Sequence, residues 1–403
     1  RKGTIDPDLM EMIPNNVRVP REMRGDLEAQ ISANRTAVTR TIALCERYGV
    51  ATVQGAANEM CSQSEKRMRA IIASWPDGSW SGEDFLDNDG INPDPIKVHV
   101  VATVAGDTLT FDFSGTSDQV AGPMNSVRGM TASATFLAVQ AGADPTIPAN
   151  DGAYRLIKII APEGSLLNPR FPAPCTAGNE TSHRIVNVVQ MALAQLPIGP
   201  NVIAGDHGSS NNLLISSVDK RTQEFKVFFS YPEGGWGALG EKDGESALFS
   251  IVGNCKNMPA EAVELHFPVR LLRYELRQDT GGPGRHRGGL GTRRDYQVLA
   301  DSASLSFVSD RCIIGANGLA GGHPGGTGRY LVDRGTGPEL AAPDFVSKGT
   351  QIPLSTGDIV SQCTAGGGGF GEPKERAPVE IERDLRLGYI SAAAATEIYG
   401  MNK

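Results

Sequence analysis

Glycine is concentrated in two stretches of this chain, and their density limits the folds that the sequence can adopt. The first reads RYELRQDTGGPGRHRGGLG (residues 273–291) and the second reads TAGGGGFGEP (residues 364–373). Because glycine has no Cβ, such segments can take positive φ angles and let backbones approach closely. With 48 glycines among 403 residues and no internal repeat, the chain is predicted to be rich in ordered loops and tight turns.

A phosphate-binding loop is the first functional interpretation that these stretches invite. The Walker A pattern G-x-x-x-x-G-K-[ST] occurs nowhere in the chain. The spacing G-x-G-x-x-G fails in the first stretch, because after Gly282 and Gly284 the next glycine is Gly288. We predict instead a strand, a turn and a strand whose arginines pair with carboxylates. The alternative is that Arg285 or Arg287 contacts an anionic ligand or partner. The second stretch either brings its backbone to a ligand or forms a tight crossing of strands.

Charge and hydropathy exclude other classes of protein. The formal net charge is −8 and Lys and Arg form no cluster, whereas nucleic-acid binding needs concentrated positive charge. No apolar run has the length that spans a bilayer, and the first residues lack the apolar core of a signal peptide. We therefore expect a cytoplasmic protein with no nucleic-acid or membrane partner. The histidines include no i, i+4 pair on a predicted helix, so we assign no metal ligand.

The first predicted segment, residues 1–90, is helical. Apolar residues recur at helical spacing after Pro20 and stop at Gly49, a residue suited to the end of a helix. A second helix is predicted from Thr52 to Ser74. We expect the two helices to pair as an antiparallel hairpin.

Two further segments complete a mixed α+β fold. Residues 91–200 read as an α/β segment, with a β-hairpin closed at Gly106–Asp107 and helices at 130–140 and from Thr181. Residues 201–403 read as short strands between glycine turns, closed by one or two short helices. This glycine-rich C-terminal half is predicted to be dominated by β-structure.

The stretch TAGNETSHRIV places polar residues where a helix begins. Backbone N–H groups and the helix dipole favour an anion or a developing oxyanion at such a site, beside Asn179, Glu180, Thr181 and Ser182. The alternative is that Thr181 or Ser182 is an ordinary N-cap and His183 a surface residue.

The stretch AGDHGSSNN packs an acid, an imidazole, hydroxyls and amides into one turn. Asp206 and His207 could hold a proton near neutral pH, and Asn211 and Asn212 could hydrogen-bond a carbonyl or amide. Adjacent residues of a strand point to opposite faces, so a hydrogen-bonded structural turn is the alternative.

A third loop, SYPEGGWGALGEKDGES, could wall a substrate pocket. Trp236 would supply an apolar face, and Glu233 or Asp243 a polar anchor. A surface loop tied by glycine turns is the alternative interpretation.

Taken together, these stretches resemble one family, the hydantoinase B/5-oxoprolinase family. The matching pieces include NNVRVPREMRGDLEAQISANRTAVTR, FDFSGTSDQVAGPMNS, IIAPEGSLLNPRFPAPCTAGNETSHRIV, PVRLLRYELRQDTGGPGRHRGGLGTRRDY and TAGGGGFGEPKER. They occur in order and extend over nearly the whole chain. The combination is specific, whereas any single piece would be weak.

The resemblance implies a partnership. An A-type ATPase subunit is expected to bind ATP and to phosphorylate the carbonyl of a cyclic amide or ketone, and the B-type subunit carries the second half-reaction. Family members begin with a further N-terminal region whose histidine- and aspartate-bearing segment is associated with a divalent metal. This chain begins where that region would have ended, so the resemblance transfers no metal ligand to any residue here.

The resulting hypothesis is the B component of a hetero-oligomeric, ATP-dependent hydrolase of a hydantoin, 5-oxoproline or lactam. The alternatives are a subunit of an ATP-dependent ketone carboxylase and a non-catalytic scaffold for A-type subunits. The candidate catalytic residues are Asn179, Asp206 and His207. The candidate substrate-binding residues are Glu180, Thr181, Ser182, Asn211, Asn212, Glu233 and Trp236. Asn179 and the start of the helix would stabilise negative charge, and Asp206 or His207 would position water or relay a proton.

Overall fold

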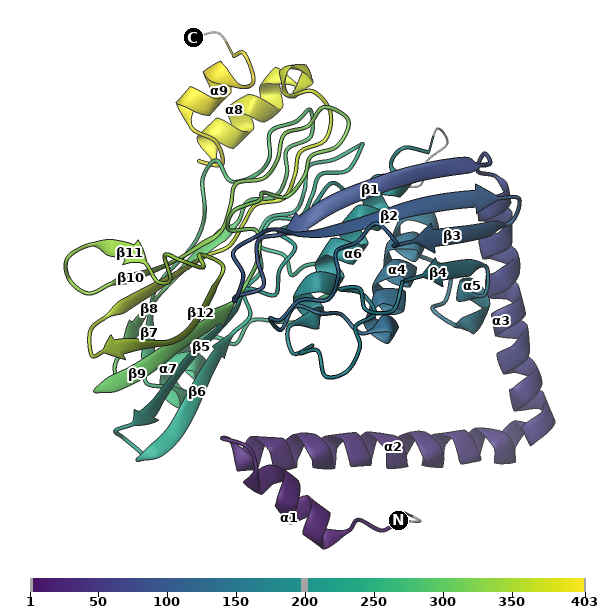
Figure 1. Ribbon diagram of the computed structural model, residues 1–403, viewed down its shortest axis with the longest axis horizontal. Coiled ribbons are helices and arrows are strands. Elements are labelled where there is room, and N and C mark those ends of the chain that lie inside the picture. Colours follow the sequence, from purple (N-terminus) through teal and green to yellow (C-terminus); the bar gives the residue numbers. More distant parts are fainter. Residues whose placement is uncertain (1–2, 197–201, 402–403) are drawn as a thin grey trace.

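The computed structural model describes residues 3–196 and 202–401 and confirms the mixed α+β fold (Figure 1). An arm of three helices leads into a layer of one sheet, two longer helices and one short helix. A β-sandwich follows, and two short helices end the chain. The boundary predicted at 200/201 lies outside the described residues, and the proposed division into segments stays a prediction.

The arm consists of α1 (Pro7–Asn15), α2 (Pro20–Tyr48) and α3 (Val50–Ala73). The prediction of two long helices broken at Gly49 is confirmed, but their antiparallel pairing is wrong. In Figure 1, α2 and α3 meet in an L-shaped corner and do not run side by side. Gly49 has a φ of +82°, which turns the chain there, and α1 packs on α2 in the place expected for α3.

The middle layer is a four-stranded sheet covered by helices. Its strands are β1 (Gly78–Leu86), β2 (Ile96–Ala105), β3 (Thr108–Asp112) and β4 (Ile157–Ile160), in the order β1-β2-β3-β4. Its helices are α4 (Arg128–Ala143), the short α5 (Asp151–Tyr154) and α6 (Gly178–Leu193).

Alternation of apolar residues builds this sheet. Successive β2 residues are buried and half-buried in turn, because side chains of a strand point to opposite faces. The predicted hairpin is confirmed: β2 and β3 pair antiparallel, and Gly106 has a φ of +60°. The helix α6 packs on β1, β2 and α4, and its side chains are almost all buried.

The second half of the chain is β-rich, as predicted. One sheet has the order β12-β9-β5-β6 and the other β11-β10-β13-β8-β7. The first sheet contains β5 (Asn212–Asp219), β6 (Glu224–Ser230), β9 (Ser302–Val308) and β12 (Lys348–Ser355). The second contains β7 (Val269–Leu276), β8 (Thr292–Val298), β10 (Arg329–Asp333), β11 (Pro338–Leu340) and β13 (Ile359–Cys363). Side chains of both sheets share one core, and α7 (Ala260–His266) packs on β7.

The two glycine-dense stretches lie against each other in a bundle of extended segments. The Gly282 amide donates to the Gly367 carbonyl (2.8 Å) and the Gly367 amide donates to the Gly289 carbonyl (3.0 Å). A Cβ on Gly288 would lie 2.0 Å from the Gly367 oxygen. Close backbone contact, and not a phosphate, therefore accounts for these glycines.

Arg277 of the first stretch donates to the backbone carbonyls of Thr327 and Thr364, and the other three arginines pair with carboxylates, as predicted. Arg273 pairs with Asp295 and Arg285 with Glu375. Arg287 Nε lies 3.1 Å from Asp384 on the C-terminal helices. Those helices, α8 (Pro378–Arg386) and α9 (Ala392–Glu397), follow a 3₁₀ turn, η1 (Pro373–Glu375), and cover one end of the bundle (Figure 1). None of the helices in the described part of the chain is long and apolar enough to cross a membrane.

Candidate functional site

The candidate site lies where the first turns of α6 meet the loop before β5. Glu180 is fully buried there and accepts hydrogen bonds from the Ser209 hydroxyl (2.8 Å) and the Ser210 amide (3.0 Å). Asn212 donates to the same carboxylate at 3.2 Å. Burial raises the pKa of Glu180 to about 7. The Glu180 carboxylate thus fixes the loop before β5 by hydrogen bonds, and one of these bonds occupies the side-chain amide of Asn212.

A cavity of about 270 Å³ opens beside these turns, and we call it the α6 cavity. Its polar lining is Ser133, Asn179, Ser182, His183, Ser210 and Tyr231, and its apolar lining is Met130, Ala134, Leu137 and Val252. This volume lies just below the range of about 300–1,000 Å³ that is usual for ligand pockets, so the cavity suits only a small ring.

Ser210 and His183 form the chemical centre of the α6 cavity. The Ser210 hydroxyl accepts from the Asn179 amide at 2.8 Å, and His183 Nε2 lies 3.4 Å from the same oxygen. Burial lowers the pKa of His183 to about 3, so the ring is neutral at physiological pH. His183 Nδ1 is buried and finds no hydrogen-bond partner among the described residues. A neutral imidazole beside a hydroxyl can accept a proton.

Asp206 and His207 lie outside this cavity. The Asp206 carboxylate accepts from the Ile251 amide at 3.2 Å and lines a separate void of about 20 Å³, where Trp236 also lies. The backbone of His207 donates to Gly235, and burial lowers the pKa of its ring. The negative charge of Asp206 acts on His183 from outside the α6 cavity and raises the pKa of His183. The effect of burial, which lowers this pKa, is larger.

The remaining candidates are held by the protein itself. Asn211 has a φ of +50°, and its side-chain oxygen accepts from Ser309 at 3.0 Å. Thr181 donates to the Met124 carbonyl, and the Ser182 hydroxyl donates to Asn179 at 2.6 Å. Trp236 Nε1 donates to the Phe249 carbonyl at 2.5 Å, and Glu233 pairs with Arg294 and Tyr274.

The structure therefore brings together Asn179 and Ser182 of the predicted residues and adds His183, Ser210 and Tyr231. The idea of His183 as a surface residue is wrong, because its exposed fraction is 1%. The alternative that Thr181 or Ser182 is the N-cap of this helix is also wrong, because α6 begins at Gly178. The residue before it, Ala177, makes no side-chain cap. The sequence signal that could have identified His183 is its spacing: Asn179, Ser182 and His183 stand at i, i+3 and i+4, which places them on one face of a helix.

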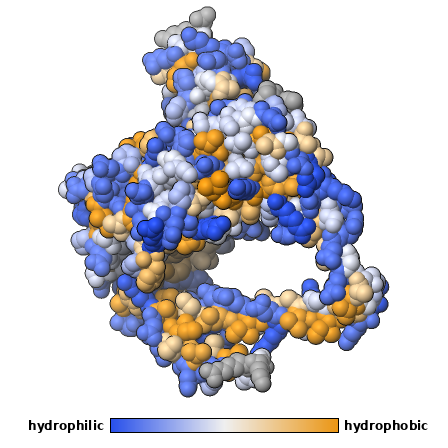
Figure 2. All heavy atoms as spheres, turned by 45° about the vertical axis from the view of Figure 1, so that its right-hand side comes forward, coloured by the Kyte–Doolittle hydropathy of each residue, from blue (hydrophilic) through white to orange (hydrophobic). Residues whose placement is uncertain are grey.

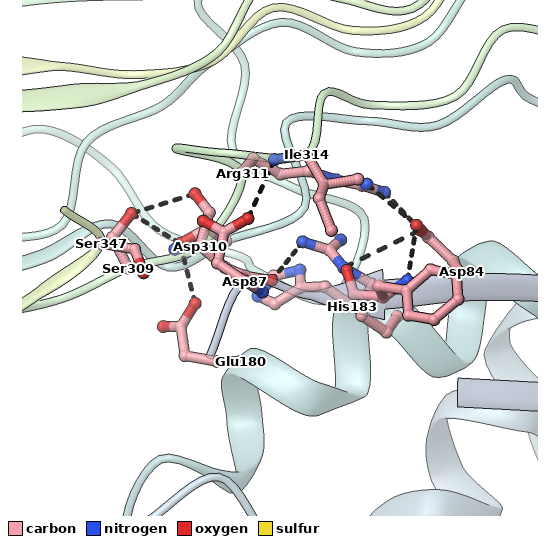
Figure 3. Close-up of polar contacts among 12 residues, drawn as sticks. Asp84, Asp87, Glu180, His183, Ser309, Asp310, Arg311, Ile314 and Ser347 are labelled. Atoms are coloured by element: carbon pink, nitrogen blue, oxygen red, sulfur yellow. Dashed lines mark hydrogen bonds and ion pairs between the residues drawn. The ribbon is translucent and has the colours of Figure 1, made fainter. Parts of the chain in front are cut away.

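Buried ion pairs fix the position of α6. Figure 3 shows Arg311 facing Asp84 (2.6 Å), and Asp87 beside Asp310. Arg184 of α6 is fully buried and pairs with Asp310 at 2.5 Å. These five residues, which we call the polar seam, join the middle layer to the loop after β9.

Asp87 completes the polar seam. Its carboxylate accepts from the backbone amides of Cys312 and Ile313. It also accepts from the amide of Ile314, which Figure 3 labels. Burial and the neighbouring Asp310 raise the pKa of Asp87 to about 6. The acids of the seam are thus occupied by guanidinium or amide partners, and do not fit a metal ion. Among the described residues no group of three His, Cys, Asp or Glu side chains could hold one.

Comparison with known proteins identifies the family. The sequence model of Hydantoinase B/oxoprolinase matches residues 1–373. The B-type component of a putative D-/L-hydantoinase from a Pseudomonas species is 34% identical over 99% of this chain and 68% of that protein. The beta chain of the caprolactamase from Pseudomonas jessenii is 27% identical over 99% of this chain and 70% of that protein.

Comparison with solved structures supports the same family. The ATP-dependent caprolactamase of Pseudomonas jessenii superposes with a TM-score of 0.89 at 25% identity, covering 99% of this chain and 70% of that one. An acetone carboxylase structure superposes with a TM-score of 0.85 at 20% identity, covering 98% and 59%, which shows the shared fold alone. The chain belongs to the hydantoinase B/oxoprolinase family.

Proposed function

We propose that this chain is the B component of an ATP-dependent hydrolase of a small cyclic amide, with the ring bound in the α6 cavity. The observation that carries the proposal is the neutral His183 beside Ser210 and Asn179 in a cavity of about 270 Å³. Two relatives are named as components of a hydantoinase and a caprolactamase, enzymes of cyclic amides, which supports this substrate class.

In this proposal an A-type partner binds ATP and phosphorylates the amide oxygen. Water then adds to the activated carbon while His183 Nε2 takes its proton. Asn179 and Ser210 hydrogen-bond the oxygen of the added water, where negative charge develops as that proton leaves. The imidazolium returns the proton to the ring nitrogen as the C–N bond breaks, and the hydroxyl of the adduct gives its own proton to the freed imidazole as it becomes the carbonyl of the acyl phosphate. A second water hydrolyses the acyl phosphate that remains, releasing phosphate and the ring-opened acid. Asp206 supports the imidazolium through its charge.

The glycine-rich bundle supports the division of labour between two subunits. The segments most like a phosphate loop are filled by backbone contacts, such as the Gly366 position, where a Cβ would lie 1.8 Å from the Thr280 oxygen. ATP binding is therefore assigned to the partner.

Turnover by the reconstituted complex tests the proposal. ATP hydrolysis and product formation would be followed with hydantoins, 5-oxoproline, lactams and ketones, with and without bicarbonate. We expect ring-opened acid from a cyclic amide, without a need for bicarbonate. Turnover of a ketone that requires bicarbonate would contradict the proposal and favour the carboxylase alternative.

A further inference from the structure

The helical arm exposes apolar side chains on two faces that the rest of the described chain does not cover. On α1 these are Leu9 and Met12, and on α2 they are Val38 and Ile42, each close to half exposed. None of the α2 side chains is buried, although the helix has 29 residues and is about 44 Å long. Figure 2 shows hydrophobic colour along the arm and an opening between the arm and the body.

Within the described part of the chain, α1 covers the first half of the apolar stripe of α2, and α3 meets α2 at the corner near Gly49. α1 packs on this first half, tied by Glu11 to Arg24 at 2.7 Å, and Leu27 and Ile31 are half-buried. In Figure 1, α1 lies beneath the N-terminal part of α2 alone. The same stripe continues into the second half of α2, where Val38 and Ile42 follow Leu27 and Ile31 at a spacing of eleven residues on one face.

The outer face of α1 matches the open half of α2 in polarity and in charge. α1 with its N-cap carries Asp6, Asp8 and Glu11 and no basic residue. The second half of α2 carries Arg35, Arg40 and Arg47 against one acid, Glu46.

Helical spacing places these charges beside the apolar residues. Arg35 precedes Val38 by one turn on the same face, and Asp8 adjoins Leu9 on the outer face of α1. The outer face of α1 and the second half of α2 are thus complementary, but they cannot meet within one chain. α1 has only nine residues and is fixed on the first half.

We propose that the arm is a contact with a second copy of this chain. The outer face of α1 in each copy packs on the second half of α2 in the other, with Asp8 near Arg35. The two α2 helices run antiparallel, with the two α1 helices between them. Such a contact uses the same two surfaces twice and closes as a two-fold dimer.

The association state of the intact chain tests this proposal. Sedimentation equilibrium is expected to show a dimer, and the double change Val38→Glu with Ile42→Glu is expected to give a monomer. The circular dichroism spectrum and the unfolding temperature of the double variant should equal those of the wild type, because these side chains are exposed. A wild-type chain that is monomeric at high concentration, or a double variant that stays dimeric, would overturn the proposal.

Charge reversal gives a second, independent measurement. Asp8→Arg and Arg35→Glu are each expected to weaken dimerisation about tenfold, and the two together to restore it. Arg40→Glu is the matched control, because Arg40 follows Val38 by two residues and lies on the opposite face of α2. An effect of Arg40→Glu as large as that of Arg35→Glu, or no recovery in the combined variant, would contradict the predicted contact.

Discussion

The glycine-rich bundle and the polar seam are both buried, yet they are held together in opposite ways. In the bundle, backbone amides and carbonyls of residues 281–291 and 364–371 bond directly to each other, and many positions leave no room for a Cβ. In the seam, long charged side chains such as Arg184 and Arg311 pair with buried acids. The bundle depends on the absence of side chains and the seam depends on their identity.

This difference shows where reactive chemistry can be placed. The bundle is packed mostly backbone to backbone, so few of its side chains, His286 and Arg287 among them, line a cavity. The seam instead holds α6 in place while the adjacent α6 cavity keeps His183, Ser210 and Asn179 facing open space. The most conspicuous motif of the sequence is therefore a scaffold, and the candidate chemistry lies in a less conspicuous stretch.

The largest effect is expected in the seam. Arg184→Met removes a buried guanidinium and leaves Asp310 with Lys348 Nζ, 3.9 Å away, as its remaining cationic partner. We expect the free energy of unfolding to fall by roughly 3–5 kcal/mol. Urea unfolding followed by tryptophan fluorescence measures it, and a loss below about 1 kcal/mol would show that the seam does not depend on its ion pairs.

A substitution in the bundle sharpens the contrast. A Cβ on Gly367 would lie 2.0 Å from the Trp236 carbonyl oxygen, so Gly367→Ala is expected to cost about 3 kcal/mol or more. Gly129 in α4 has open space at its Cβ position and serves as the control. Gly129→Ala is expected to be neutral or to stabilise by up to about 1 kcal/mol. Equal unfolding midpoints for the two variants would contradict the account of the bundle.

A pH-dependent effect is expected at Glu180. Its pKa is about 7 in the folded protein against an ordinary value of 4.5, so the folded state keeps a proton that the unfolded chain has released. Glu180 therefore lowers stability as pH rises through this window. We expect Glu180→Gln to match the wild type near pH 4.5 and to exceed its stability by up to about 3 kcal/mol above pH 7.

Urea unfolding across this pH range measures the difference, with the exposed Glu241→Gln as a control. A stability difference that stays constant with pH would indicate that Glu180 titrates normally.

Much of the fold could be predicted because it depends on local patterns. The alternation in β2 and the glycine at position 106 define a hairpin without tertiary information. The pairing of the arm helices could not be predicted, because amphipathic spacing in α2 shows that a partner is needed but does not say which. That partner is α1 over the first half of α2.

The candidate site was predicted in part for a related reason. The residues at the start of α6 were identified by type, but burial decides what each one does. Glu180 points to its own loop, whereas His183, whose surroundings come from residues 130–137, 210 and 231, faces the cavity. Contacts between segments so far apart in sequence leave no signal in a single chain.

The measurement that tests the central claim most directly is ring opening by the reconstituted complex carrying His183→Ala. We predict a fall in kcat of about 10²–10⁴-fold with an unchanged unfolding temperature, because His183 is assigned the transfer of the proton. His266→Ala, an exposed histidine of α7, is the matched control and should retain full activity. Activity of the His183 variant within a few-fold of wild type would contradict the assignment of the α6 cavity as the site of hydrolysis.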